Sequence, residues 1–394
     1  MTQHKAGKYI FFFGFFLLSN IYCLAQVRVG AERTEQYLSL LDGKKIGIVA
    51  NQSSLVDYLN TVDTLIRSGV NIIKIFSPEH GFRGYAEAGS SIENFTDSET
   101  GLEVISLYGS KKKPSAADLK GIDLVIFDIQ DVGVRFYTYI STLTYMMEAC
   151  AESKIPLLLL DRPNPNGFYI DGPVLEKEYS SFVGLHPVPI VYGMTIGEYA
   201  QMVNGEGWMK NGIKCRLTVI PVENYTHQTR YHLPVSPSPN LISMNAVYLY
   251  PSLCFFEGTM MSIGRGTSFP FEVFGHPDWL HCTFVFIPRS IRGMSLHPPF
   301  EGIECHGVDL RLITRDRPEY LGGIQLSFLI AAYTDLRDHP GFFTPYFDKL
   351  AGTAKLREQI VQGLPEEEIK MSWSEELGKF IVTRSKYLLY PDKP

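Results

Sequence analysis

The chain has 394 residues, of which 45% are hydrophobic and 20% are charged, values typical of a globular protein able to bury a sizeable core. At roughly 100–200 residues per domain, this length favours two domains. The formal net charge of −6 argues against a nucleic-acid-binding surface, which would need a basic stripe.

The N-terminus has the pattern of a secretory signal peptide. Lys5 and Lys8 precede an apolar run over residues 9–18, and a small-residue cleavage site ends at Ala25. The run is shorter than the ~20 residues of a spanning helix, and no later segment resembles one. We therefore expect residues 1–25 to be removed, leaving a periplasmic or secreted protein without a membrane span. A lipid anchor on Cys23 is an alternative that the bulky Tyr22 disfavours.

The five remaining cysteines are widely spaced and form no C-x-x-C pair, which disfavours a zinc or redox motif. In a large exported domain we expect them to be buried small residues rather than a disulfide framework, with one bridge left as an alternative. They are Cys150, Cys215, Cys254, Cys282 and Cys305.

Apolar strands alternate with helices in the first half of the mature chain. This alternation predicts an α/β domain over residues 26–225, with a Rossmann-like parallel sheet covered by helices on both faces. No G-x-G-x-x-G follows the first strand, so we expect no dinucleotide or other cofactor. The predicted strands are 43–50, 71–76, 103–108, 123–127, 155–160 and 214–222, and the predicted helices are 30–41, 61–68, 115–119, 141–153 and 196–204.

Polar side chains follow four of these strands directly. The carboxyl ends of parallel strands share one edge of a sheet, where open α/β folds place their ligand sites. The sequence therefore predicts a functional cleft at this edge. Its polar groups would be Asn51, Glu79 with His80, Asp128 with Asp131, and Asp161 with Arg162.

The second half, residues 226–394, is predicted to be a smaller α+β domain. Its strands are expected at 282–288 and 307–314, and its helices at 323–335, 355–362 and 374–386. The Gly-rich stretch 257–271 lacks a Walker lysine, which argues against a nucleotide loop. We interpret this stretch as a loop that closes over the cleft and contributes Glu257 and Arg265.

The residue types in the cleft favour a carbohydrate. The sequence has no G-x-S-x-G elbow and no H-E-x-x-H motif. A metal site made from His80, Asp128 and Asp131 is an alternative that no spacing demands. Carboxylates beside Tyr137, Tyr139 and arginines suit glycosidic cleavage, which needs a protonated acid and a base or nucleophile.

Four sequence blocks together resemble the YbbC/NamZ family, the exo-β-N-acetylmuramidases of glycoside hydrolase family 171. The resemblance covers nearly the whole mature chain, and the blocks occur in the order found in the family. They are Ser77-Pro78-Glu79-His80-Gly81-Phe82-Arg83-Gly84, the stretch Phe127 to Tyr139, Asp161-Arg162-Pro163-Asn164-Pro165, and Glu257-Gly258-Thr259 with Gly264-Arg265-Gly266-Thr267.

The resemblance implies release of N-acetylmuramic acid from the non-reducing end of peptidoglycan disaccharides or muropeptides during cell-wall turnover, with Glu79 as the catalytic glutamate. His80, Asp128 and Asp131 complete the predicted catalytic group. Another peptidoglycan hydrolase, such as an amidase or esterase, and a non-catalytic muropeptide-binding protein are the alternatives. The predicted substrate-binding residues are Asn51, Arg83, Arg135, Tyr137, Tyr139, Asp161, Arg162, Asn164, Glu257, Arg265 and Thr267.

Overall fold

The computed structural model describes residues 26–84, 93–317, 320 and 322–393, so the predicted signal peptide lies outside the described part of the chain. Its centre is a seven-stranded sheet in the order β5-β6-β4-β1-β7-β8-β9. Only β5 is antiparallel to its neighbour. The strands are β1 (Ile46–Ala50), β4 (Ile72–Ser77), β5 (Phe95–Thr96), β6 (Glu103–Ser106), β7 (Leu124–Asp128), β8 (Leu157–Leu160) and β9 (Leu217–Ile220).

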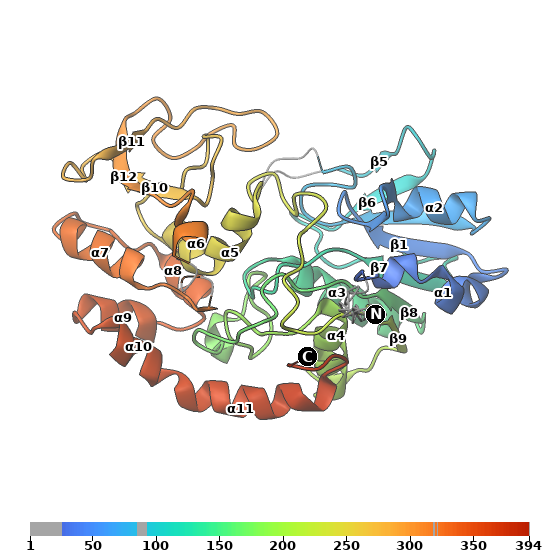
Figure 1. Cartoon of the computed structure of the whole chain (residues 1–394). Helices are drawn as coiled ribbons and strands as arrows, with labels where there is room; N and C mark the ends of the chain where they lie inside the picture. Colours follow the sequence, from blue (N-terminus) through green and yellow to red (C-terminus); the bar gives the residue numbers. More distant parts are fainter. Residues whose placement is uncertain (1–25, 85–92, 318–319, 321, 394) are drawn as a thin grey trace, which may run out of the picture.

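The six parallel strands have the order 3-2-1-4-5-6 of a Rossmann fold. Helices α1 (Thr34–Leu41) and α2 (Thr61–Arg67) pack on one face of this sheet, in the same core as Ile75. Helices α3 (Tyr139–Glu152) and α4 (Ile196–Gly205) pack on the other face with Phe76. Successive strand residues point to opposite faces, so a strand covered on both sides is apolar throughout. The predicted fold class is confirmed (Figure 1).

Helix α4 begins where its capping residues predict, whereas one predicted helix does not form. Thr195 accepts a hydrogen bond from the Glu198 amide, and Glu198 bonds back to the Thr195 amide, forming a capping box at the start of α4. The helix predicted at 115–119 is instead a series of turns. Asp118 accepts hydrogen bonds from the Ser115 amide and hydroxyl, and this local bonding competes with a helix.

The second half carries a small antiparallel sheet and most of the remaining helices. The sheet has the order β10-β12-β11, and its first strand was not expected from the sequence. Helices α5, α6, α8 and α10 were also not predicted, and the strand expected at 307–314 ends at Asp309, before α6 begins. The elements are α5 (Met244–Leu253), β10 (Val273–His276), β11 (Phe284–Phe286), β12 (Cys305–Asp309), α6 (Ile313–Asp316), α7 (Ser327–Leu336), α8 (Pro345–Ala351), α9 (Lys355–Val361), α10 (Glu366–Ser372) and α11 (Ser374–Arg384).

Short elements complete the fold. A two-stranded ribbon formed by β2 and β3 follows β1. The 3-10 turn η4 follows α5 directly and positions one wall of the site described below. The short elements are η1 (Gly30–Glu32), β2 (Leu55–Val56), β3 (Leu59–Asn60), η2 (Lys177–Tyr179), η3 (Lys210–Gly212), η4 (Cys254–Gly258) and η6 (Ser385–Tyr387).

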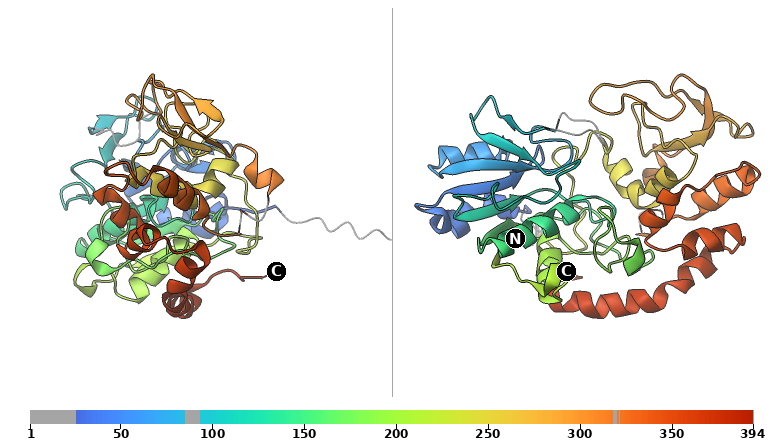
Figure 2. Two further views of the ribbon diagram at one scale, coloured as in Figure 1. Left: turned by 90° about the vertical axis from the view of Figure 1, so that its left-hand side faces the viewer. Right: turned by 180° about the vertical axis from the view of Figure 1, so that it is seen from behind.

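The C-terminal helices return to the Rossmann-like half. Helix α11 runs back beneath α4, as Figures 1 and 2 show. Arg384 at its end donates two hydrogen bonds to the Gly193 carbonyl. One hydrophobic core extends from the sheet through α3 and α4 into α7, α8 and α9, so the two halves pack as a continuous body. The predicted domain boundary at residue 226 remains a prediction.

Within residues 26–84 and 93–393, leaving aside the three uncertain positions near 320, no helix is both long and apolar enough to cross a bilayer. All five described cysteines have free thiols. Cys150, Cys215, Cys254 and Cys305 are buried, and Cys282 is half-buried.

Candidate active site

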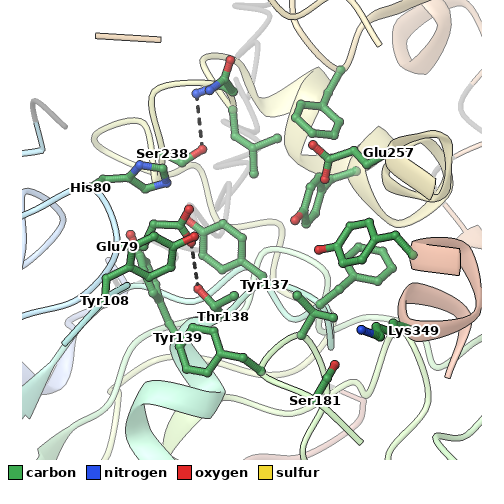
Figure 3. A pocket seen from close by; sticks show the side chains of 18 of the residues that line it. Glu79, His80, Tyr108, Tyr137, Thr138, Tyr139, Ser181, Ser238, Glu257 and Lys349 are labelled. Atoms are coloured by element: carbon green, nitrogen blue, oxygen red, sulfur yellow. Dashed lines mark hydrogen bonds between the residues drawn. The ribbon is translucent and has the colours of Figure 1, made fainter. Parts of the chain in front are cut away.

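A pocket of about 430 Å³ lies where the carboxyl edge of the sheet meets the second half of the chain. Its size is in the usual range for small-molecule sites. One wall comes from the loops after β4 and β6 and from the start of α3, and the other comes from α5, η4 and α8 (Figure 3). The polar and aromatic residues that line it are Glu79, His80, Tyr108, Lys112, Phe136, Tyr137, Thr138, Tyr139, Ser181, Phe182, Ser238, Asn240, Tyr250, Glu257, Arg265, Phe271, Tyr346 and Lys349.

Glu79 and His80 reach the pocket because the chain turns sharply after β4. The Gly81 amide donates to the Pro78 carbonyl at 3.1 Å, which closes the turn. His80 has a φ of +71°, a left-handed conformation that is uncommon for a residue with a side chain. Glu79 is half-buried, and its Oε2 accepts a hydrogen bond of 3.2 Å from the Thr138 hydroxyl (Figure 3). The turn therefore presents a carboxyl group and an imidazole side by side.

Tyrosines surround Glu79. Burial, and next the charge of Glu79, raise the pKa of the Tyr108 phenol, which keeps it protonated as a hydrogen-bond donor. The Tyr137 and Tyr139 rings meet edge to face with centroids 4.7 Å apart. Both hydroxyls donate to the Pro237 carbonyl, and the Asn51 side-chain amide donates to Tyr139. These contacts fix an aromatic surface of the kind that the apolar faces of a sugar can pack against.

A second carboxylate lies across the pocket from Glu79 (Figure 3). Glu257 sits in η4, and its Oε1 accepts hydrogen bonds from Arg265 Nε at 2.9 Å and Nη2 at 2.5 Å. Arg265 also lies over the Phe271 ring at 5.2 Å from its centroid. The predicted loop over the cleft is thus held by an internal ion pair that faces the pocket.

Two lysines in the pocket were not expected from the sequence. Lys112 belongs to a run of three lysines, and it follows a strand that ends at the same sheet edge. Lys349 lies in the last turn of α8, a helix that the sequence did not predict. Lys112 could have been predicted by extending the search for polar residues at the sheet edge to the loop after the third strand. No sequence pattern around Lys349 predicts that it reaches the pocket.

Asp128 and Asp131 lie outside the residues that line the pocket. Asp128 is the last residue of β7 and forms a buried ion pair with Arg162, with distances of 2.6 and 2.9 Å. Asp131 Oδ2 accepts hydrogen bonds from the Gly133 amide and the Tyr192 hydroxyl. Burial raises the pKa of Asp131 to about 6. Neither carboxylate is placed where it could contact a ligand in this pocket.

Asp161 and Asn164 also organise the protein interior. Asp161 accepts hydrogen bonds from the Thr195 hydroxyl, the Gly197 amide and the Tyr390 hydroxyl, and burial raises its pKa to about 7. The Asn164 side chain donates to the Met194 carbonyl.

Arg83, Arg135 and Thr267 were also predicted to bind substrate, but each bonds to other groups of the protein instead. Arg83 pairs with Asp97 through two hydrogen bonds of 2.9 and 3.1 Å. Arg135 is fully buried and donates to the carbonyls of Pro173, Val188, Leu350 and Ala351. Thr267 closes a turn on the Gly264 carbonyl.

Of the predicted site residues, the structure gathers Glu79, His80, Tyr137, Tyr139, Glu257 and Arg265 around one cavity. Among the residues it describes, no three His, Cys, Asp or Glu side chains are grouped as metal ligands would be. The cavity therefore offers two carboxylates on opposite walls, an imidazole, two ammonium groups and a lining of tyrosines.

Comparison with known proteins places this arrangement in a family. Residues 46–245 match the family model described as exo-beta-N-acetylmuramidase NamZ, N-terminal, and residues 248–390 match its C-terminal counterpart. The chain belongs to the NamZ family. The expected resemblance is thereby confirmed, and the two models divide the chain between residues 245 and 248, near the start of α5.

Individual relatives agree with this assignment. The peptidoglycan beta-N-acetylmuramidase NamZ of Bacillus subtilis (strain 168) is 41% identical over 378 residues, covering 90% of this chain and 89% of that protein. Two crystal structures from Bacteroides fragilis NCTC 9343, both described as DUF1343 family proteins, have the same fold. The first is 47% identical with a TM-score of 0.86, covering 94% of this chain and 100% of that one. The second is 30% identical with a TM-score of 0.77, covering 92% and 99%.

Proposed function

We propose that this glycoside hydrolase of the NamZ family cleaves the β-1,4 bond after a non-reducing terminal N-acetylmuramic acid in peptidoglycan fragments. Given that the chain belongs to this family, the main support for the proposal is the position of Glu79. Glu79, from the Pro-Glu-His-Gly-Phe-Arg-Gly block, lines the pocket between the sheet edge and the second half and is oriented by the Thr138 hydroxyl. The peptidoglycan muramidase of Bacillus subtilis supports the substrate class through its identity to this chain.

Glu79 is proposed as the general acid that protonates the oxygen of the leaving sugar. Glycoside hydrolysis commonly uses two carboxyl groups flanking the scissile bond. Since Asp128 and Asp131 do not line the pocket, Glu257 is the second carboxyl group there among the residues that the structure describes. Arg265 holds it in place, and it would activate water or orient the acetamido group of the substrate. His80 would hydrogen-bond the sugar beside Glu79.

The test uses the mature chain and the disaccharide N-acetylmuramyl-β-1,4-N-acetylglucosamine, with products followed by mass spectrometry. We expect free N-acetylmuramic acid from the wild type. Glu79→Gln should lower kcat by roughly 10²–10⁴-fold, the usual contribution of a general acid. Glu178→Gln changes an exposed glutamate outside the pocket and should keep full activity.

Each other outcome has a definite meaning. Near-normal turnover by a folded Glu79→Gln protein would remove Glu79 from the mechanism. Saturable binding of the disaccharide without product would favour a muropeptide-binding protein. Cleavage only of peptide-bearing fragments, at an amide or ester bond, would favour a different wall hydrolase.

We also propose that the protein is exported and acts in cell-wall turnover, most naturally in the periplasm. The N-terminal pattern of residues 1–25 supports export. N-terminal sequencing of the protein from fractionated cells should find a mature chain beginning at Gln26. An intact Met1 in the cytoplasmic fraction would contradict this proposal.

A further inference from the structure

The proposed substrate carries a charge that the pocket must accommodate. N-acetylmuramic acid differs from N-acetylglucosamine by a lactyl ether that ends in a carboxylate. Burying a carboxylate without a cationic or hydrogen-bonding partner is costly, so a site that selects this sugar needs a cation facing that group.

The arginines predicted to bind substrate are either outside the pocket or paired with a carboxylate. Arg83, Arg135 and Arg162 lie outside the residues that line the pocket. Arg265 does line it, but its Nε and Nη2 both donate to Glu257. Glu257 neutralises the charge of Arg265, so among the described residues the pocket's cations without a carboxylate partner are the two lysines.

Lys112 differs from its neighbours in the lysine run. Lys111 pairs with Asp118 at 3.1 Å, and Lys113 pairs with two glutamates of α3. Lys112 has no carboxylate partner among the described residues. Its ammonium lies 4.5 Å from the centroid of the Phe182 ring, which itself lines the pocket. The ring holds the ammonium through a cation–π contact and leaves its N–H donors available to a ligand.

Lys349 approaches from the other half of the molecule. It lies in the last turn of α8, and no carboxylate within the described part of the chain pairs with it. Figure 3 shows its side chain reaching into the pocket from the side opposite Glu79. Both ammonium groups line one cavity without carboxylate partners, so an anion bound in it would be attracted by both.

We propose that Lys112 and Lys349 together bind the lactyl carboxylate and thereby select N-acetylmuramic acid over N-acetylglucosamine. The inference rests on the proposed function for the identity of the ligand. One lysine comes from each wall, so the bound carboxylate connects the sheet edge to α8 across the pocket. The lysines act on specificity and binding, whereas Glu79 acts on the bond that breaks.

Monosaccharide binding tests this pair without any need for catalysis. The ligands are N-acetylmuramic acid, its neutral lactyl methylamide and N-acetylglucosamine, measured by titration calorimetry at low ionic strength. The wild type should bind the acid most tightly. Lys112→Gln and Lys349→Gln should each weaken that binding roughly tenfold, which corresponds to the loss of one charge-assisted hydrogen bond. Neither variant should change binding of the methylamide.

Lys111→Gln is the matched control, since this lysine is adjacent in sequence but lies outside the pocket. It should bind all three ligands like the wild type. Lys112→Arg and Lys349→Arg should keep part of the preference for the acid. Added salt should weaken binding of the acid by the wild type and leave the methylamide unaffected.

The failure of this inference is distinguishable from failure of the proposed function. The lysine pair would be overturned if the wild type bound the acid and the methylamide with equal affinity. It would also be overturned if the lysine variants lost affinity for both ligands equally, or if the wild type did not bind the acid. Lysine-dependent binding of the acid by a protein that leaves the disaccharide intact would overturn hydrolysis and keep the pair. Hydrolysis of the disaccharide together with binding of the acid that does not depend on the lysines would overturn the lysine pair and keep the proposed hydrolysis.

Discussion

Thr138 donates a hydrogen bond to Glu79 from the N-cap position of α3. A threonine at this position usually bonds to the amides of its own helix. Here the hydroxyl makes no such bond and instead contacts Oε2 of Glu79 at 3.2 Å. The start of α3 therefore orients a carboxyl group delivered by the loop after β4, and a side chain expected to stabilise a helix is directed to the site.

Thr138→Val should lower kcat on the disaccharide about 3- to 10-fold, the usual net value of one hydrogen bond. The cause is a less well-oriented Glu79 rather than weaker substrate binding, so KM should change less than kcat. Thr138→Ser keeps the hydroxyl and should keep most of the activity. Because the hydroxyl does not cap the helix, the free energy of unfolding of Thr138→Val should stay within about 0.5 kcal/mol of the wild type. Steady-state kinetics and urea unfolding measure both quantities, and unchanged kcat would contradict the orienting role.

The expectation that polar residues after parallel strands share one sheet edge located the site. It did not distinguish which of those side chains reach the pocket. Glu79 follows the last residue of β4 by two positions, in a turn that leaves the sheet. Asp128 is still part of β7, and its side chain meets Arg162 inside the protein. Sequence periodicity predicts the edge of a sheet, whereas the direction of each polar side chain depends on neighbours distant in sequence.

The lysines illustrate the same limit. Three consecutive lysines give no indication of which one lacks an ionic partner. Asp118 of the same loop pairs with Lys111, and Glu148 pairs with Lys113 only when α3 packs beside the loop. Lys349 reaches the pocket through the docking of α8 against η4, which no local pattern shows. The Rossmann-like half was predictable because its buried strands are continuously apolar. The second half was harder because its strands are short and partly exposed.

Arg135 is predicted to stabilise the fold rather than bind substrate. It is buried, and its guanidinium donates to two carbonyls of the first half and to those of Leu350 and Ala351 at the end of α8. Arg135→Met would leave these buried acceptors without donors, so we expect a loss of at least about 3 kcal/mol in the free energy of unfolding.

Arg311→Met is the control for this change. Arg311 forms a partly exposed pair with Asp309, so its loss should cost less than about 1 kcal/mol. Urea unfolding compares the two variants. A small effect at Arg135 together with a raised KM would instead return this residue to substrate binding.

Tyr390 should anchor the C-terminal segment to the Rossmann-like half. Its hydroxyl donates to Asp161 Oδ2 at 2.5 Å and accepts from the Val222 amide at 2.8 Å, all in buried surroundings. Tyr390→Phe leaves the buried Val222 amide without an acceptor and removes one of the hydrogen bonds that Asp161 accepts, so it should destabilise the protein by about 1–3 kcal/mol. Tyr387→Phe removes a hydroxyl that donates to Glu206 in a more exposed position and should cost less. Equal thermal shifts for the two variants would contradict this anchoring role.

Asp131 gives a prediction for the dependence of stability on pH. Burial raises its folded-state pKa to about 6, above the ordinary aspartate value of 3.8, so the folded protein holds this proton more tightly than the unfolded chain. The resulting stabilisation is complete below pH 4 and is lost as the pH rises through 6. Over two pKa units it amounts to about 3 kcal/mol.

Asp131→Asn keeps the shape of the side chain and its bonds from Tyr192 and Gly133 but cannot ionise. The difference in unfolding free energy between the variant and the wild type should therefore move in favour of the variant between pH 4 and pH 7, and it should be constant above pH 7. Urea unfolding at five or six pH values measures this difference. A difference that does not depend on pH would show that Asp131 titrates alike in the folded and unfolded chains, and the carboxylate would then be ionised within the core.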